Sequence, residues 1–169
     1  MKAITVWQPW ATLWARGAKQ FETRSWATSY RGPIAIHAAA ISVPRVLKQL
    51  FPLGVWSYAP GFEEKTKFLN AVGNALLTPM DELPLGAVIA TAELVDCHRI
   101  VLHGGRGLSS QDPGWLETDR GIYEPTDQEL LLGDWTPGRF AWEIRNVKML
   151  PEPILAKGKQ RLWNWEGAA

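Results

Sequence analysis

The sequence predicts an α+β fold, a small mixed β-barrel of about five or six strands with a helix after the first strand. Three observations lead to this class. Short strand-like stretches are spread over the whole chain, one helical pattern follows the first of them, and a regular strand–helix–strand rhythm is missing. A chain of 169 residues with 46% hydrophobic content can also bury a substantial core. We therefore expect residues 1–169 to form a single domain.

The first strand and its following helix are predicted from local patterns. Residues 3–7 alternate as a strand, and Gln8-Pro9 fits a helix start because proline there lacks only an amide that would have no partner. Three apolar residues then recur with the spacing of one buried helical face: Trp10, Leu13 and Trp14. Gly17 is the type of residue that ends a helix in the left-handed conformation.

The second predicted strand, residues 19–24, carries its charged side chains on one face. Alternation puts Glu22, Arg24 and Trp26 on the same side, and the residues between them on the other. A carboxylate, a guanidinium and an indole make a poor core and a good wall for a ligand. Lys19 can join them only if it still belongs to the turn that follows the helix. The same residue types also fit an ordinary surface strand with a Glu–Arg pair.

A third strand and a helical elaboration follow. Residues 33–38 are predicted as a strand with its isoleucines directed inward. His37 lies on the opposite face, where it is either a ligand-facing donor or an ordinary half-buried histidine. Residues 39–85 are predicted as a helical elaboration between strands, with helices over 43–51 and 62–77.

The second half of the chain alternates between strands and a long connection. Residues 87–96 are predicted as a strand, in which Glu93 is a second candidate for a cleft-facing carboxylate. A long loop is predicted at 98–132, interrupted only by one or two helical turns after a capping box that begins at Thr126. The remaining predicted elements are a long strand over 139–150 and a short strand that ends near Trp165.

Composition excludes several classes of protein. No window approaches the roughly 20 apolar residues of a membrane span, and the first residues do not resemble a signal peptide, so no membrane partner is expected. The single cysteine, Cys97, rules out an internal disulfide framework and favours a reducing cytoplasm. Cys97, His98 and His103 lack the second CxxC or HxxxH pair of a zinc site. We therefore expect neither a metal nor a cofactor.

Charge and tryptophan content point to a polyanion or a nucleobase as partner. Residues 1–48 contain seven Lys or Arg and one acidic residue, whereas residues 49–138 contain five basic and thirteen acidic ones. If the chain ends meet in one sheet, a basic face results, which is the usual footprint of nucleic acid. The ten tryptophans include several near strand ends, where an open indole can stack on a base, although each one alone is more often a core anchor.

Several of these motifs together resemble the ASCH (activating-signal-cointegrator homology) domain. They are QPWA at 8–11, GAKQFETR at 17–24 and RGPIAIHA at 31–38, and the similarity continues over 86–97 and at Pro153-Ile154, Lys157-Gly158 and Trp163. The resemblance covers most of the chain except the helical section and the long loop. It implies a barrel related to the PUA domain of RNA-modifying enzymes, with a cleft that faces nucleic acid or a nucleobase. The binding positions it implies, together with the aromatic and basic residues beside them, are Gln8, Trp10, Lys19, Glu22, Arg24, Trp26, Arg31 and His37.

The resemblance also implies a possible activity. Some bacterial relatives are amidohydrolases that remove an acyl group from the exocyclic amine of cytidine with a lysine, a threonine and a glutamate. Lys19 matches that lysine, but Glu22 stands where the threonine nucleophile would be. Ribonuclease activity has also been proposed in the family.

Three functional hypotheses follow. In the first, the protein binds RNA, DNA or a free modified nucleoside: Lys19, Arg24 and Arg31 contact phosphate, and an open tryptophan stacks on a base. In the second, the protein is a hydrolase in which Lys19 acts as base and Glu22 or Glu93 activates a water. In the third, residues 39–85 form an adaptor surface for another protein.

Overall fold

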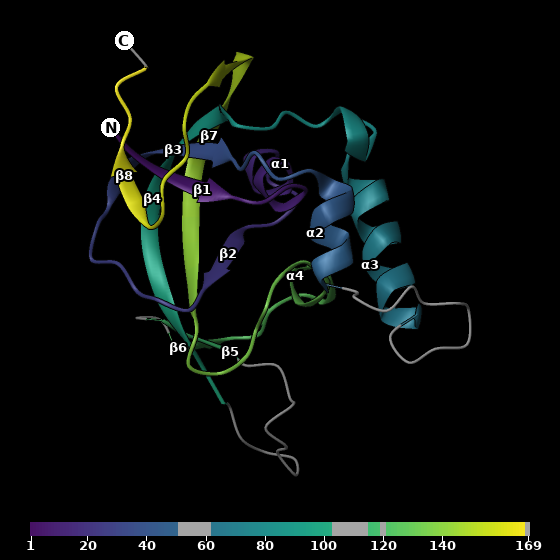
Figure 1. Ribbon diagram of the computed structural model, residues 1–169. Helices are drawn as coiled ribbons and strands as arrows, with labels where there is room; N and C mark the ends of the chain where they lie inside the picture. Colours follow the sequence, from purple (N-terminus) through teal and green to yellow (C-terminus); the bar gives the residue numbers. More distant parts are fainter. Residues whose placement is uncertain (51–61, 103–114, 119–120, 168–169) are drawn as a thin grey trace.

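A curled, eight-stranded sheet with helices along one side forms the protein (Figure 1). The computed structural model describes residues 1–50, 62–102, 115–118 and 121–167. The strands are β1 (Lys2–Val6), β2 (Phe21–Arg24), β3 (Gly32–Ala38), β4 (Ala87–Val101), β5 (Trp115–Thr118), β6 (Gly121–Tyr123), β7 (Phe140–Leu155) and β8 (Leu162–Asn164). The mixed α+β class and the barrel-like sheet predicted from the sequence are confirmed, with more strands than the five or six expected.

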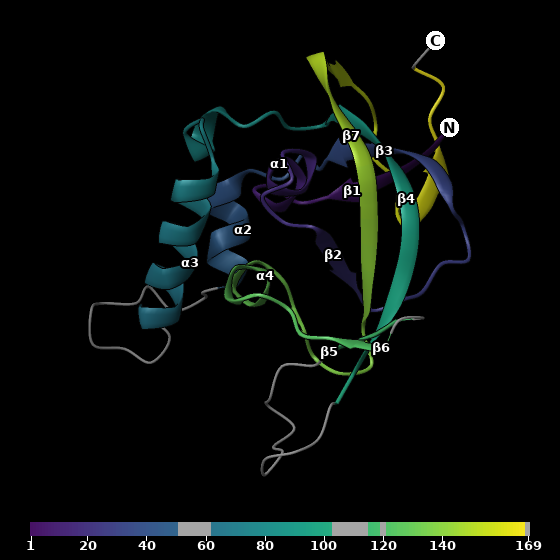
Figure 2. The same cartoon turned by 180° about the vertical axis from the view of Figure 1, so that it is seen from behind.

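The sheet has the order β2-β7-β4-β3-β1-β8, with β5 and β6 attached to β4, and the long strands β4 and β7 curve side by side (Figure 2). Three register shifts interrupt that pair and a fourth interrupts β3–β4, and each such bulge increases the local bend and twist. β1 pairs in parallel with β3 and antiparallel with β8. The terminal ammonium donates to the Trp165 carbonyl at 2.9 Å, so the two ends of the described chain lie together.

Helix α1 (Trp10–Ala15) is positioned by its own end groups and packs against the curled sheet. The buried Gln8 side chain accepts from the Thr12 amide at 3.1 Å, which satisfies one of the unpaired donors of the first turn. Gly17 ends the helix with φ of +72°, as expected for a left-handed stop. Trp14 is fully buried in the core cluster together with Trp142.

The remaining helices cover one flank of the barrel (Figure 1). They are α2 (Val43–Leu50), α3 (Phe62–Ala75), the short 3₁₀ helix Met80–Glu82 and α4 (Asp127–Leu132). Leu13 on α1 shares a buried cluster with Val72 on α3 and Leu132 on α4, so one helix face joins the barrel to this flank. None of the helices in the described ranges is both long and apolar enough to cross a membrane.

The expectation of a long loop at 98–132 is wrong for most of its described residues. β4 continues through Val101 because Ile100 is a buried anchor in a cluster with Leu116 and Phe21. β5 then pairs with the end of β4, and β6 pairs with β5. Glycine and serine in the segment suggested irregular chain, while the pairing that makes these strands is long-range and leaves little local trace. His103 lies outside the described residues.

Candidate functional site

Lys19 and Glu22 form a buried ion pair at the start of β2. The turn after Gly17 carries Lys19 back over the strand, and its ammonium donates to Glu22 Oε2 at 2.8 Å and to the Leu132 carbonyl at 3.3 Å. The Lys19 side chain is 1% exposed and that of Glu22 is 10% exposed. A charged pair this deep loses hydration, and the two acceptors of the Lys19 ammonium offset part of that loss.

Arg24 completes the group from the same face of β2. Its guanidinium lies 3.2 Å from Glu22 Oε1 and donates to the Thr5 carbonyl at 2.9 Å. We call Lys19, Glu22 and Arg24 the charged cluster. Burial by itself raises the pKa of Glu22, but the charges of Lys19 and Arg24 outweigh it and hold that pKa below its ordinary value of 4.5. The carboxylate therefore stays ionised between two cations.

A cavity of about 340 Å³, here called the inner cavity, opens beside the ion pair. Lys19 and Glu22 lie at one side, and Arg139 and Asp134 contribute a second ion pair to the lining. The rings of Trp10 and Phe68, 5.5 Å apart, supply an apolar wall. This volume is within the roughly 300–1,000 Å³ of small-molecule pockets. A flat ring with both donors and acceptors suits such a lining.

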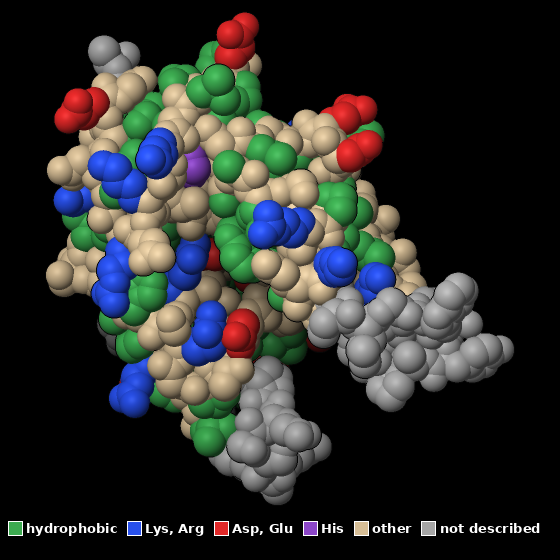
Figure 3. Space-filling view, in the orientation of Figure 1, with side chains coloured by type: hydrophobic (Ala, Val, Ile, Leu, Met, Phe, Trp, Pro, Cys, Tyr) green, Lys and Arg blue, Asp and Glu red, His purple; other side chains and the backbone are tan. Residues whose placement is uncertain are grey.

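A second hollow of about 360 Å³, here called the basic groove, adjoins the cluster through Arg24. Its lining combines cations and indoles: Trp7, Arg24, Trp26, Lys159 and Arg161. The Arg161 guanidinium lies 5.5 Å from the Trp26 ring centre, and Trp7 is 44% exposed. Lys and Arg side chains surround a hollow on this face of the molecule, with an acidic side chain inside it (Figure 3). The residues Lys-Gly-Lys-Gln at 157–160 can be read from the sequence, but only the fold places this segment beside Arg24.

Residues 156–161 reach the basic groove because His37 and Thr5 hold them. His37 Nε2 lies 2.9 Å from the Ala156 carbonyl oxygen, and the Thr5 hydroxyl donates to the Lys159 carbonyl at 3.0 Å. The ring of His37 is almost fully buried, and this burial lowers its pKa. Gly158 passes so close that a Cβ there would lie 2.5 Å from His37 Cε1. His37 thus contacts the chain that carries the groove cations, and it does not line the groove.

The structure places three other predicted site residues away from both hollows. Gln8 is fully buried, and its amide bonds to Thr12 and to the Pro84 carbonyl. Arg31 is an exposed side chain paired with Asp96 at 2.6 Å. Glu93 is exposed and accepts a hydrogen bond from Asn146 at 2.9 Å. Of the predicted set, the inner cavity and the basic groove therefore unite Trp10, Lys19, Glu22, Arg24 and Trp26.

Metal ligation has no geometric support in the described ranges. There, no three His, Cys, Asp or Glu side chains are grouped so that they could hold an ion. Cys97 is partly buried, which raises the pKa of its thiol. His98 is hydrogen-bonded to Glu143 at 2.9 Å.

The charged cluster makes stability depend on pH in acid. Because the folded pKa of Glu22 is lowered, the ionised carboxylate stabilises the protein fully above the unfolded pKa, and this contribution is lost as pH falls through the folded value. The free energy of unfolding should therefore decline more steeply below about pH 4.5 in the wild type than in Glu22→Gln. Urea denaturation at a series of pH values measures both slopes. Parallel slopes would contradict a lowered pKa at Glu22.

The protein has an α+β fold with a curled sheet, and the inner cavity with its charged lining lies beside β2. This architecture is that of a small PUA-like barrel. The model of the ASCH domain matches residues 4–151, and the chain belongs to the ASCH domain family. No curated protein matches the chain significantly. The matched range includes the whole charged cluster and ends before Lys159 and Arg161, so these two groove cations are a feature of this chain outside the family match.

Proposed function

We propose that the protein binds single-stranded RNA through the basic groove, with an unstacked base entering the inner cavity. One observation carries the proposal: Arg24, Lys159 and Arg161 line one hollow together with two indoles. Cations along a groove track phosphates, and an open indole stacks on any base. Membership of the ASCH family, whose fold is related to RNA-binding PUA domains, supports the same class of partner.

The inner cavity supplies the selective part of the proposed site. Glu22 accepts hydrogen bonds from an exocyclic amine or a ring N–H, and Lys19 donates to a ring carbonyl. Trp10 and Phe68 provide the apolar surface against which the flat ring packs. The groove gives affinity and the cavity gives a preference among bases, because a buried polar group left unpaired by the wrong base costs about 1–3 kcal/mol.

The proposal is tested by the affinity for single-stranded RNA and DNA oligonucleotides, measured by fluorescence anisotropy over a salt series. Lys159→Ala combined with Arg161→Ala should weaken binding at low salt about tenfold or more and reduce the salt slope by about 1.4, the value for two lost contacts to single-strand phosphates. Lys148→Ala, an exposed lysine that lines a different cavity with Glu93, is the matched control and should bind like the wild type. Equal affinity of all three proteins across the series would refute the groove.

Hydrolysis of an acylated cytidine is a second candidate, favoured by one observation: Lys19, Glu22 and Thr23 all line the inner cavity. Glu93 lies elsewhere and cannot act there. The Thr23 hydroxyl accepts from the Asp134 amide at 3.0 Å, which fixes the position of its oxygen at the cavity. Release of acid from N4-acylated cytidine by the wild type and not by Thr23→Ala would support this candidate. Equal background rates would eliminate it.

A further inference from the structure

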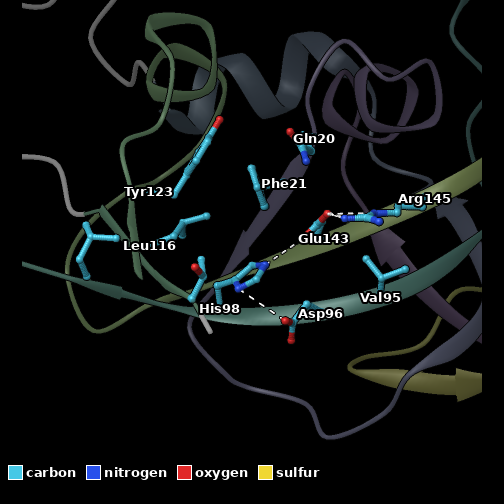
Figure 4. A pocket seen from close by; sticks show the side chains of 11 residues that line it. Gln20, Phe21, Val95, Asp96, His98, Leu116, Tyr123, Glu143 and Arg145 are labelled. Atoms are coloured by element: carbon cyan, nitrogen blue, oxygen red, sulfur yellow. Dashed lines mark hydrogen bonds and ion pairs between the residues drawn. The ribbon is translucent and has the colours of Figure 1, made fainter. Parts of the chain in front are cut away.

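A separate cavity of about 470 Å³ lies where β2, the β4–β7 pair and the β5–β6 hairpin meet (Figure 4). Phe21 alternates with Glu22 on β2, so its ring points away from the charged cluster and toward His98. Tyr123 faces Phe21 from β6, with 5.8 Å between the ring centres. One wall of this cavity, here called the hairpin cavity, is therefore aromatic.

The floor of the hairpin cavity is a chain of charged and polar groups. His98 Nε2 lies 2.9 Å from Glu143 Oε2, and Arg145 donates to Glu143 Oε1 at 3.1 and 3.2 Å. On the other side of the ring, Nδ1 is 3.7 Å from Asp96 Oδ2. A bulge between Leu94 and Asp96 shifts the register with β7, which places Asp96 opposite Glu143. Bulges often redirect a side chain at functional sites.

Only the inner part of this floor is buried. His98 and Glu143 are both 8% exposed and adjoin an apolar cluster formed by Phe21, Ile100 and Leu116, whereas the side chains of Asp96 and Arg145 are 41% and 66% exposed. Placing two polar side chains beside an apolar cluster costs hydration that their mutual hydrogen bond has to offset. Burial raises the pKa of Glu143, but hydrogen bonds and charge from His98 and Arg145 outweigh it and hold this pKa below its ordinary value. The carboxylate is therefore an ionised acceptor.

Within the described residues, the carboxylates of Glu143 and Asp96 keep hydrogen-bond acceptor positions that a ligand can use. An ionised carboxylate offers about four lone-pair directions. At Glu143, His98 and Arg145 use three. Asp96 Oδ1 accepts from Arg31 and from the Cys97 amide, while among the described residues Oδ2 has His98 as its neighbour, at 3.7 Å and too far for a hydrogen bond. Two carboxylates at one cavity disfavour an anionic ligand and favour one that donates.

We propose that the hairpin cavity binds a flat heterocycle that bears an exocyclic amine, of the size of a nucleobase. The ring packs against the aromatic wall that Phe21 and Tyr123 form together, and the amine donates to Glu143. Asp96 Oδ2 is the second acceptor. The site lies on the opposite face of β2 from the charged cluster and does not depend on the proposed RNA groove.

Two pairs of free nucleosides test this proposal, because each pair differs chiefly by exchange of an amine for a carbonyl. Adenosine and cytidine should shift the backbone amide NMR signals of Phe21, His98 and Tyr123, and should bind about tenfold tighter than inosine and uridine, as expected for one hydrogen bond to a charged acceptor. Tyr123→Ala, a change at a side chain that is already 38% exposed, should weaken adenosine binding at least severalfold.

The outcomes separate the two sites. Lys159→Ala with Arg161→Ala should leave adenosine binding in the hairpin cavity unchanged, while Tyr123→Ala should leave RNA affinity unchanged. Shifts confined to the indoles of Trp7, Trp10 and Trp26 would overturn the hairpin site and leave the proposed RNA site intact. Equal affinity for adenosine and inosine, or no shift at Phe21 and His98 with any nucleoside, would overturn it as well.

Discussion

Replacing Lys19 with methionine is expected to lower the free energy of unfolding by about 3–5 kcal/mol, the usual cost of leaving one partner of a buried pair alone. The Lys19 ammonium is enclosed, with Glu22 and the Leu132 carbonyl as its acceptors. Methionine fills nearly the same space, so packing changes little and the loss comes from the uncompensated Glu22 carboxylate. Arg24 alone offsets only part of the negative charge of Glu22, since the Arg24 guanidinium is 25% exposed and also donates to the Thr5 carbonyl.

A double variant separates this electrostatic explanation from a packing defect. Adding Glu22→Gln to Lys19→Met removes the stranded charge and should recover most of the lost stability in urea denaturation. Lys67→Met is the matched control, because Lys67 pairs with Glu63 at an exposed helix surface, where solvent screens the ion pair and its loss should change stability little. A loss below about 1 kcal/mol in Lys19→Met, or no recovery in the double variant, would contradict a buried ion pair.

Gly158→Val should displace residues 156–161 and weaken RNA binding at the same time. Even the first carbon of a side chain at Gly158 would lie 2.5 Å from His37 Cε1 and 2.9 Å from Thr5 Oγ1. The His37 ring is rigid and buried among Trp163 and its neighbours, so the backbone has to move instead. Overpacking of this kind costs about 1–3 kcal/mol. The shift carries Lys159 and Arg161 away from Arg24, and oligonucleotide affinity should fall severalfold.

Gly73→Ala is the control for a glycine substitution as such. Among the described residues, apart from its chain neighbours and the backbone of its own helix, no atom lies within 4 Å of a Cβ at Gly73, and the residue is in the interior of α3. Alanine there should raise the melting temperature slightly, since it is favoured over glycine in a helix by about 1 kcal/mol. If Gly158→Val retained full stability and full RNA affinity, His37 and Thr5 would not be holding the groove segment in place.

The cluster residues were predictable because their arrangement depends mainly on local geometry. Alternation along four residues of β2 puts Glu22 and Arg24 on one face, and the glycine stop places Lys19 in the adjoining turn. Helix α1 was predictable for the same reason, because the spacing of its tryptophans and leucine and the glycine stop at Gly17 are both local features of the sequence.

Other predicted site residues line neither the inner cavity nor the basic groove, for reasons that only the packing shows. Gln8 belongs to the most recognisable motif of the chain, yet its amide caps α1 and is closed off from solvent. Arg31 and Glu93 lie on strands or turns with suitable polarity, but their partners Asp96 and Asn146 hold them elsewhere. Conversely, the sequence pattern predicts His98 in a loop, although long-range pairing makes it a buried member of β4.

By itself, the sequence determined the α+β barrel class, the ASCH resemblance and the side of β2 that carries charge, because each depends on short-range periodicity or on a motif read along the chain. The tertiary structure alone decided that residues 156–161 lie beside Arg24, and that β5 and β6 close the hairpin cavity next to Phe21. Those arrangements bring together residues separated by about a hundred positions or more. Side-chain packing and strand register set such contacts, and neither is written in a local pattern.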